Sequence, residues 1–197
     1  MRSKPDHYTQ RAKKEGYPAR SVYKLQELDQ KLKLLPKSGS ILDVGAAPGS
    51  WSLYAERASK GRIQLVAVDL KPVEAGLDPA TSLILQGDVF DEALQDQLAS
   101  RAPYKLIMSD AAPATTGNRT IDCGRSFSLV EGIIGLIPRY LAPNGNFIAK
   151  IFQGGKERNL LSQLQEHFSS AKMMKPKACR SESFETFLIG IGYRGKS

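Results

Sequence analysis

Cysteine and histidine are scarce in this chain, and long apolar runs are lacking. The sequence has two cysteines, Cys123 and Cys179, and two histidines. These are too few for a disulfide framework or a zinc site, so we expect reduced thiols and no metal. Apolar stretches such as 187–191 are far shorter than the roughly 20 residues that cross a bilayer. Because the first residues carry charge but no apolar signal segment, the sequence predicts a cytoplasmic protein with no membrane partner.

The composition is that of one globular domain. The chain has 197 residues, of which 41% are hydrophobic and 24% charged, so it can bury a core and is a poor fit to a disordered chain. We therefore expect one domain over 1–197, and a monomer.

Positive charge is concentrated at the start of the chain. The net charge is +8, and residues 1–38 hold ten basic and four acidic side chains. A second basic run near the C-terminus contains Lys172, Lys175, Lys177 and Arg180. If the fold brings both segments together, they would form one surface for a polyanion. A solvated surface that only keeps the protein soluble is the alternative.

Short apolar runs alternate with helical stretches after this basic leader. The predicted strands are 41–44, 63–69, 82–87, 105–109, 146–151, 171–174 and 187–193, and the predicted helices are 21–28, 50–58, 91–98, 127–140 and 157–168. This alternation predicts an α/β fold over 39–197, with a mainly parallel sheet and helices on both faces. A loop rather than a helix separates the last two strands, so they could form an antiparallel pair at an edge.

Three strand ends in this pattern are acidic. Asp43 precedes a loop of small residues, Asp69 lies about 20 residues beyond that loop, and Asp88 ends the third strand. Ligands of open α/β sheets bind beyond the carboxyl ends of the strands, so three such residues in order predict a nucleoside pocket. A single one would more often be a helix cap. The loop departs from the G-x-G-x-x-G pattern, which disfavours a nicotinamide-dependent oxidoreductase and favours an adenosine ligand without phosphates.

Two later strand ends carry Asp110 and Lys150. Lys150 lies within apolar sequence, where a lysine is either an edge residue that reaches water or a functional amine. We expect Asp110 at the same edge of the sheet, close enough to pair with it. A buried lysine near other cations can lose its proton near neutral pH and act as a base.

Four stretches of the chain, 6–28, 43–52, 109–113 and 147–154, resemble the FtsJ/RrmJ family, and the similarity covers nearly the whole chain. The resemblance implies a seven-stranded, Rossmann-like class I methyltransferase fold. It also implies S-adenosylmethionine as the cofactor and the ribose 2′-hydroxyl of RNA as the methyl acceptor, with no metal required. The cofactor-binding residues that we predict are Asp43, Gly45, Ala46, Ala47, Pro48, Gly49, Trp51, Asp69, Asp88, Val89 and Asp110. The aromatic ring of Trp51 could pack in the core instead.

The resemblance also implies a catalytic tetrad. Its members are Lys24, Asp110, Lys150 and Glu185, with Glu182 as the competitor for the fourth place. We prefer Glu185 because an apolar strand begins directly after it. Lys150 would deprotonate or steer the 2′-hydroxyl and Asp110 would orient that lysine. Lys24 would repel the charge of Lys150 and help to hold the substrate, and Glu185 would orient Lys24 or the substrate.

The compact chain most resembles the bacterial members that modify ribosomal RNA. We therefore expect a uridine of 23S-type large-subunit ribosomal RNA, methylated during ribosome assembly. A tRNA anticodon loop is the main variant, an mRNA cap is a distant third, and a non-catalytic RNA-binding assembly factor is the other class of function. The chain departs from the usual family pattern at Ser50, Ala114 and Phe184, where glycine, asparagine and arginine are usual.

Overall fold

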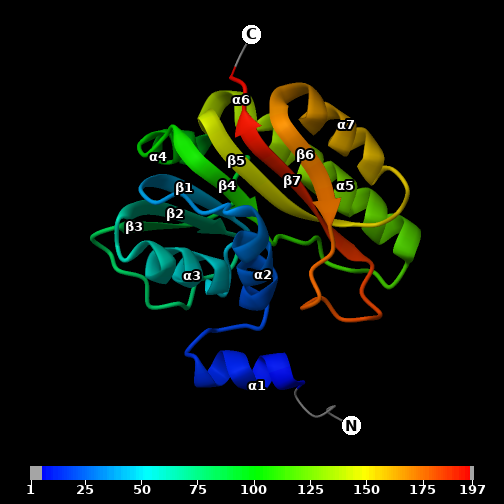
Figure 1. Cartoon of the computed structure of the whole chain (residues 1–197), viewed down its shortest axis with the longest axis horizontal. Coiled ribbons are helices and arrows are strands. Elements are labelled where there is room, and N and C mark those ends of the chain that lie inside the picture. Colours follow the sequence, from blue (N-terminus) through cyan, green and yellow to red (C-terminus); the bar gives the residue numbers. More distant parts are fainter. Residues whose placement is uncertain (1–5, 196–197) are drawn as a thin grey trace.

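A seven-stranded sheet organises the protein. The structure is a computed structural model that describes residues 6–195 (Figure 1). The strands are β1 (Gly39–Val44), β2 (Ile63–Asp69), β3 (Ser82–Gln86), β4 (Tyr104–Ser109), β5 (Leu141–Phe152), β6 (Phe168–Met174) and β7 (Glu185–Tyr193). The helices are α1 (His7–Lys14), α2 (Val22–Leu32), α3 (Ser50–Ser59), α4 (Glu92–Ala99), α5 (Arg119–Gly135), α6 (Ile137–Tyr140) and α7 (Glu157–His167). Within residues 6–195, no helix is long and apolar enough to cross a membrane.

The sheet has the order β3-β2-β1-β4-β5-β7-β6. The first five strands pair in parallel, and β7 is antiparallel to both β5 and β6. The predicted α/β fold with a mainly parallel sheet is therefore confirmed. The predicted antiparallel pair also forms, but β7 lies inside the sheet. This position fits its sequence, because Phe187, Leu188 and Ile189 are all fully buried and a strand that is apolar on both sides needs cover on both faces.

Two apolar clusters lie on opposite faces of the sheet. Successive side chains of a strand point to opposite faces. In β5, Phe147 therefore faces the cluster formed with α4, α5 and α7, whereas Ile148 faces the cluster formed with α2 and α3. Helices thus cover both faces, as the alternation of strands and helices predicts.

Several helix boundaries differ from the predictions, and α2 extends to Leu32 instead of ending at Leu28. Helix α1 was not predicted separately. The Asp6 side chain caps its first turn by accepting a hydrogen bond from Thr9 N. Helix α5 starts at Arg119 rather than near 127, because the Asn118 side chain accepts hydrogen bonds from the first free N–H groups. It ends at Gly135, and the short α6 follows with Pro138 in its first turn, where proline interrupts a longer helix.

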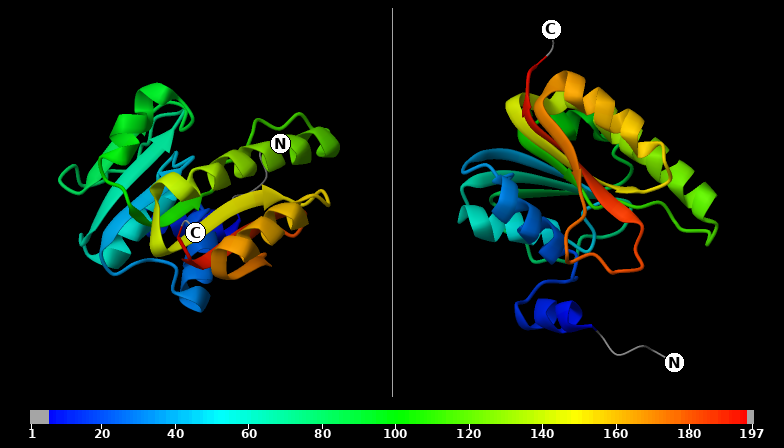
Figure 2. Two further views of the ribbon diagram at one scale, coloured as in Figure 1. Left: turned by 90° about the horizontal axis from the view of Figure 1, so that it is seen from above. Right: turned by 45° about the vertical axis from the view of Figure 1, so that its right-hand side comes forward.

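Much of the basic leader belongs to the core. Leu25 and Leu28 of α2, and Leu34 after it, are fully buried in the cluster on the α2 and α3 face. Helix α1 lies apart from the sheet beneath α2 (Figure 1, Figure 2) and packs through Ala12 and the Tyr8 ring against Tyr23. The leader thus combines a helix fixed against the sheet with a second helix at the periphery.

Leu28 tests how firmly α2 is held against the sheet. Replacement by alanine should lower the free energy of unfolding by about 2–5 kcal/mol, the usual cost of truncating a fully buried leucine. Urea denaturation followed by circular dichroism measures this loss. The exposed Gln30 of the same helix is the matched control, and Gln30→Ala should change stability by less than about 0.5 kcal/mol. Equal effects of the two substitutions would contradict the packing described.

Candidate active site

Strand register brings Lys150 and Glu185 to one face of the sheet. Lys150 lies two residues after Ile148 in β5 and therefore points to the same face, which α2 and α3 cover. In β7, Glu185 shares that face with Phe187 and Ile189. Lys150 lies opposite Phe187 in the register, and Glu185 lies opposite Phe152. Because β7 runs antiparallel, its first residue reaches the edge at which the parallel strands end.

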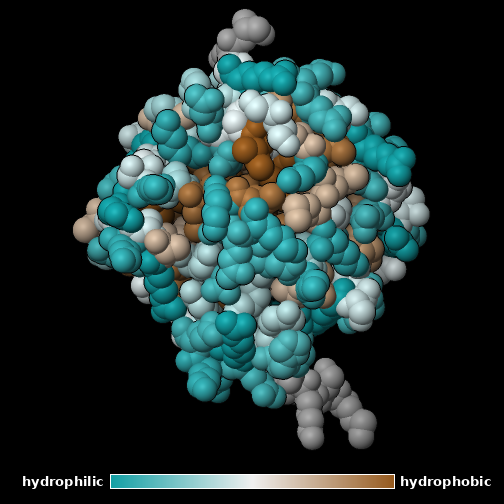
Figure 3. All heavy atoms as spheres, viewed as in Figure 1, coloured by the Kyte–Doolittle hydropathy of each residue, from teal (hydrophilic) through white to brown (hydrophobic). Residues whose placement is uncertain are grey.

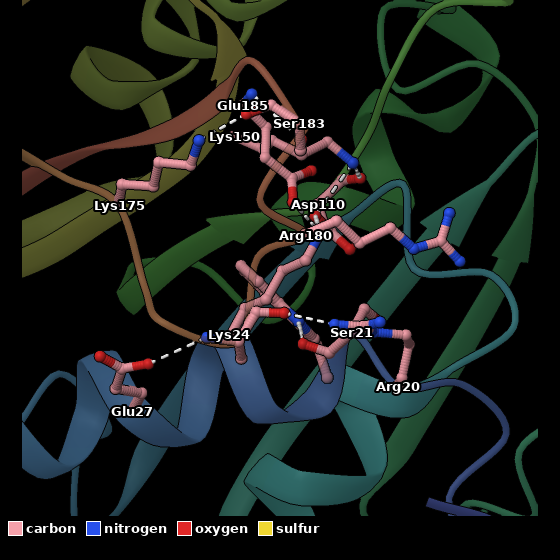
Figure 4. Close-up of polar contacts among 12 residues, drawn as sticks. Arg20, Ser21, Lys24, Glu27, Asp110, Lys150, Lys175, Arg180, Ser183 and Glu185 are labelled. Atoms are coloured by element: carbon pink, nitrogen blue, oxygen red, sulfur yellow. Dashed lines mark hydrogen bonds and ion pairs between the residues drawn. The ribbon is translucent and has the colours of Figure 1, made fainter. Parts of the chain in front are cut away.

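Four charged side chains meet at this edge (Figure 4). Lys150 Nζ lies 3.0 Å from Asp110 Oδ1 and donates a hydrogen bond of 2.6 Å to the Asp110 carbonyl oxygen. Lys24 Nζ, from α2, lies 2.8 Å from Glu185 Oε1 and 3.9 Å from Asp110 Oδ1. All four side chains are at most 18% exposed. The structure thus brings the four residues of the predicted tetrad together. Each lysine pairs with one carboxylate, and Lys24 also lies near Asp110.

The charges of this cluster stabilise one another. Burial lowers the pKa of the Lys24 ammonium, but Asp110 and Glu185 raise it by more, so this pKa lies above its ordinary value. Burial raises the pKa of the Glu185 carboxyl, but Lys24 and Lys150 lower it by more, so this pKa lies below its ordinary value. Lys24 therefore stays an ammonium and Glu185 a carboxylate at neutral pH.

Glu182 occupies a different position from Glu185. It is exposed, and its carboxylate accepts a hydrogen bond of 2.9 Å from Ser181 Oγ. Glu185 is the acidic residue of this segment that contacts Lys24. The buried thiol of Cys179 lies against Glu185, and burial raises the pKa of this thiol to about 12.

Asp43 is a fully buried acid near the carboxyl end of β1. Its Oδ2 atom accepts a hydrogen bond of 2.6 Å from Ser52 Oγ of α3, and its Oδ1 atom has no hydrogen-bond partner among the described residues. Burial raises the pKa of Asp43 to about 7, although the bond from Ser52 lowers it. A buried acceptor without a partner calls for a donor, and a positively charged one would stabilise the carboxylate.

Two glycines allow close packing of the loop after β1 against neighbouring segments. Gly45 has φ +72°, and a Cβ atom there would lie 2.4 Å from Ala111 Cβ. Gly49 has φ +108°, and its Cβ would lie 2.5 Å from Ala75 Cβ. Both positions therefore require glycine. Pro48 ends the run of small residues, and α3 begins after Gly49 with its N-terminus at the loop.

The remaining predicted cofactor residues differ in their surroundings. Asp69 accepts hydrogen bonds from Ala47 N at 2.9 Å and from Lys71 N at 2.8 Å, which fixes its carboxylate beside the loop. Asp88 is exposed and bonds Phe90 N, and Val89 is buried.

Trp51 is part of the core. Its ring lies 5.8 Å from that of Phe187, and its Nε1 donates to the Ser21 carbonyl. Ser50, one residue earlier, accepts a hydrogen bond from Ala19 N and donates one to Ala19 O. The first turn of α3 is therefore bonded to the segment that leads into α2.

A pocket of about 360 Å³ opens beside the tetrad. Its lining includes Arg20, Ser21, Lys24, Arg180, Glu182, Ser183 and Glu185. Arg20 pairs with Asp6 and donates to Ala178 O, and Arg180 Nε lies 3.9 Å from Asp6 Oδ2. The two basic segments predicted to share a surface therefore meet at this pocket. Sequence reasoning missed Arg20 and Ser52 as site residues, because only the tertiary fold brings them there.

The fold and these strand-end residues define a Rossmann-like, class I, S-adenosylmethionine-dependent methyltransferase. The model of the FtsJ-like methyltransferase family matches residues 17–193. Ribosomal RNA large subunit methyltransferase E of Treponema denticola is 44% identical over 98% of this chain and 97% of that protein. The protein of the same name from Desulforapulum autotrophicum is 43% identical over 95% of this chain and 92% of that one. The chain belongs to the FtsJ-like methyltransferase family.

Solved structures agree with this assignment. A ribosomal RNA methyltransferase from Plasmodium falciparum superposes with a TM-score of 0.81 at 27% identity, over 91% of this chain and 100% of that one. Human methyltransferase-like protein 13, solved with S-adenosylhomocysteine, has a TM-score of 0.61 at 18% identity, over 87% of this chain and 80% of that one, and shares the fold.

The residues around Asp43 fit S-adenosylmethionine, the cofactor of this family. The partnerless Oδ1 atom of Asp43 suits the amino group of the cofactor, which is a cation. The small side chains of loop 45–49 allow a ligand to approach the backbone at the start of α3.

The raised pKa of Asp43 makes stability depend on pH. In the unfolded chain this carboxyl titrates near pH 4, and in the folded protein near pH 7. Between these values the folded protein holds a proton that the unfolded chain releases. The free energy of unfolding of the cofactor-free protein should therefore fall as pH rises from 4 to 7, by at most about 1.4 kcal/mol per pH unit from this group.

Urea denaturation at several pH values from 5 to 8 measures this dependence. Asp43→Asn keeps an acceptor for Ser52 and removes the titration, so the difference between wild type and variant isolates this carboxyl. Parallel curves for the two proteins would show that Asp43 titrates at its ordinary pKa.

Proposed function

We propose that the protein transfers a methyl group from S-adenosylmethionine to the 2′-hydroxyl of a uridine in large-subunit ribosomal RNA, in the cytoplasm and as a monomer. The observation that carries the proposal is the buried cluster of Lys24, Asp110, Lys150 and Glu185 beside a pocket lined by Arg20 and Arg180. Relatives that match almost the whole chain are named as large-subunit ribosomal RNA methyltransferases, which supports this substrate.

The cofactor would be held along the carboxyl ends of β1, β2 and β3. In this proposal Asp43 binds the amino group, Asp69 binds the ribose hydroxyls and Asp88 with Val89 contacts the adenine. The loop 45–49 contributes its backbone, and Trp51 supports the loop from the core. When bound, S-adenosylmethionine supplies a methyl group on a positively charged sulfur, which is already activated for transfer.

The tetrad aligns the ribose oxygen and handles its proton. As an uncharged amine Lys150 accepts the proton of the 2′-hydroxyl, whereas as an ammonium it holds the oxygen in line; Asp110 orients the Lys150 amine through both its carboxylate and its carbonyl oxygen. Lys24 faces the pocket as an ammonium that can hold the ribose or a phosphate. Glu185, paired with Lys24 at 2.8 Å, fixes its direction.

RNA would reach the tetrad across a basic surface. Lys13 and Lys14 of α1 are exposed, as are Lys175, Lys177 and Arg180 near the start of β7. Hydrophilic side chains cover the α1 end of the molecule (Figure 3). Phosphate contacts by such lysines give affinity and orient the strand without reading its sequence.

The first experiment is transfer of radiolabelled methyl groups to ribosomal particles, free ribosomal RNA and tRNA. We expect label on a ribose 2′-oxygen of the large-subunit RNA. Lys150→Ala and Asp110→Ala should lower the transfer rate by at least about 100-fold, as loss of a proton-transfer group or of its partner does, and Lys150→Ala should change the cofactor affinity measured by calorimetry little. Asp69→Ala should instead weaken cofactor binding.

Other outcomes of this experiment exclude the proposal in distinct ways. Label confined to tRNA would show that tRNA, not ribosomal RNA, is the substrate. Label on a base would show that the methyl acceptor is a base atom and not the ribose 2′-oxygen. Cofactor binding without transfer to any RNA would favour a non-catalytic assembly factor. Equal loss of cofactor affinity in all three variants would overturn the separate roles of the residues.

The salt dependence of RNA binding tests the role of α1. If Lys13 and Lys14 each contact a phosphate, Lys13→Gln and Lys14→Gln should each reduce the slope of log affinity against log salt by about one. Fluorescence anisotropy with a labelled ribosomal RNA fragment measures this slope. Lys105 is an exposed lysine at the start of β4, at the other end of that strand from Asp110. Lys105→Gln is the control and should leave the slope unchanged. An unchanged slope for Lys13→Gln would show that Lys13 contacts no phosphate.

A further inference from the structure

An aromatic pair lies beside the tetrad at the end of β5. The rings of Phe152 and Phe184 have centroids 4.7 Å apart and planes inclined by 59°. Both side chains are half-buried. Phe152 is the last residue of β5, two residues after Lys150, and lies opposite Glu185 in the register. At about 3.3 Å per residue, the α-carbons of Phe152 and Lys150 are about 7 Å apart along the strand.

Phe152 also forms one wall of a pocket of about 460 Å³ between β5 and the first turns of α5. The remaining lining includes Arg119, Thr120, Cys123, Gly124, Phe127 and the segment 153–157. This volume is in the range of small-ligand sites. The wall opposite α5 is fixed, because Glu157 accepts hydrogen bonds from Gly154 N at 3.1 Å and Gly155 N at 2.7 Å.

The charges available at this pocket are positive. Arg119, the first residue of α5, has its guanidinium 5.2 Å from the Phe184 ring centroid and donates to Gln153 O. Arg119 and Lys156 are exposed, whereas the acidic Glu157 is buried and already bonded to the loop. The pocket therefore combines an aromatic wall with cations at its rim, which is the chemistry that binds a nucleobase and its phosphate.

We propose that this pocket, with Phe152 as its stacking surface and Arg119 at its rim, holds an unstacked base of the RNA strand whose ribose lies at the tetrad. The inference rests on the proposed function, since it requires an RNA substrate. Phe184 acts as a positioning residue that supports Phe152 from the side. Because Phe152 lies only two residues after Lys150 in β5, a base held in this pocket restrains rotation of the RNA backbone at the nucleotide whose ribose oxygen must be aligned.

Binding to two matched single-stranded ligands tests the pocket without any need for methyl transfer. One is a labelled 12-residue RNA of mixed sequence, and the other is a ribose-phosphate chain of equal length without bases. Wild type should bind the RNA about tenfold more tightly than the abasic chain, because stacking on one aromatic side chain contributes on this scale. Fluorescence anisotropy at one salt concentration gives both affinities and hence their ratio.

Two substitutions should lower this ratio to less than a third of the wild-type value. Phe152→Leu removes the ring, and Phe152→Tyr should restore the ratio. Gly124→Leu fills the pocket; Gly124 lines it, and a Cβ atom there meets nothing within 4 Å. Gly135→Leu is the matched control, because Gly135 is in the same helix, outside this pocket, and has equally open surroundings.

A ratio that Gly124→Leu leaves unchanged, or that Gly135→Leu lowers as much, overturns the proposal. So does a wild type that binds both ligands equally. If wild type shows the expected ratio but transfers no methyl group to ribosomal RNA, the proposed function fails while the base pocket stands. The affinity for the abasic chain should be the same in all variants, which separates loss of the base contact from a general loss of folding.

Discussion

The ion pairs among Lys24, Asp110, Lys150 and Glu185 connect four separate parts of the fold. Helix α2, the loop after β4, β5 and β7 each contribute one charge, and the four charges sum to zero. A charge that is largely removed from water is tolerated only when a partner offsets its lost hydration. Each member therefore depends on the others, and removal of one leaves a buried charge without its counterpart.

The antiparallel direction of β7 makes this cluster possible. A parallel strand in that place would begin at the opposite edge of the sheet, and its first residue would lie far from Lys150. Because β7 is reversed, Glu185 at its start lies beside the ends of the parallel strands, opposite Phe152. Phe187, Leu188 and Ile189 are all buried, which holds β7 between β5 and β6. Phe187 and Ile189 face α2 and α3, and Glu185, two residues before Phe187, faces the same side.

The parts of the fold that depend on local pattern could be predicted from the sequence. Alternating apolar runs predicted all seven strands and the two-sided cover of helices, and strand-end positions predicted that Asp110 and Lys150 meet. The start of α5 was missed because one capping side chain, Asn118, decides it.

Side-chain contacts that form only on folding could not be predicted, because no local sequence pattern indicates them. The bond between Asp43 and Ser52, and the meeting of Arg20 with Arg180 at Asp6, arise only when the chain is folded. The choice of Glu185 over Glu182 had only a weak basis in the sequence, namely the start of an apolar strand. The contact with Lys24 distinguishes the two residues in the structure, whereas the catalytic roles of the tetrad stay predictions.

The hydrogen bonds at the first turn of α3 have a mechanical consequence. Ser50 exchanges two hydrogen bonds with Ala19, and Trp51 Nε1 donates to Ser21 O, three residues before Lys24. These three bonds tie the glycine loop to the start of α2, the helix that carries Lys24. A ligand that displaces the loop must therefore either break these bonds or displace the start of α2 as well.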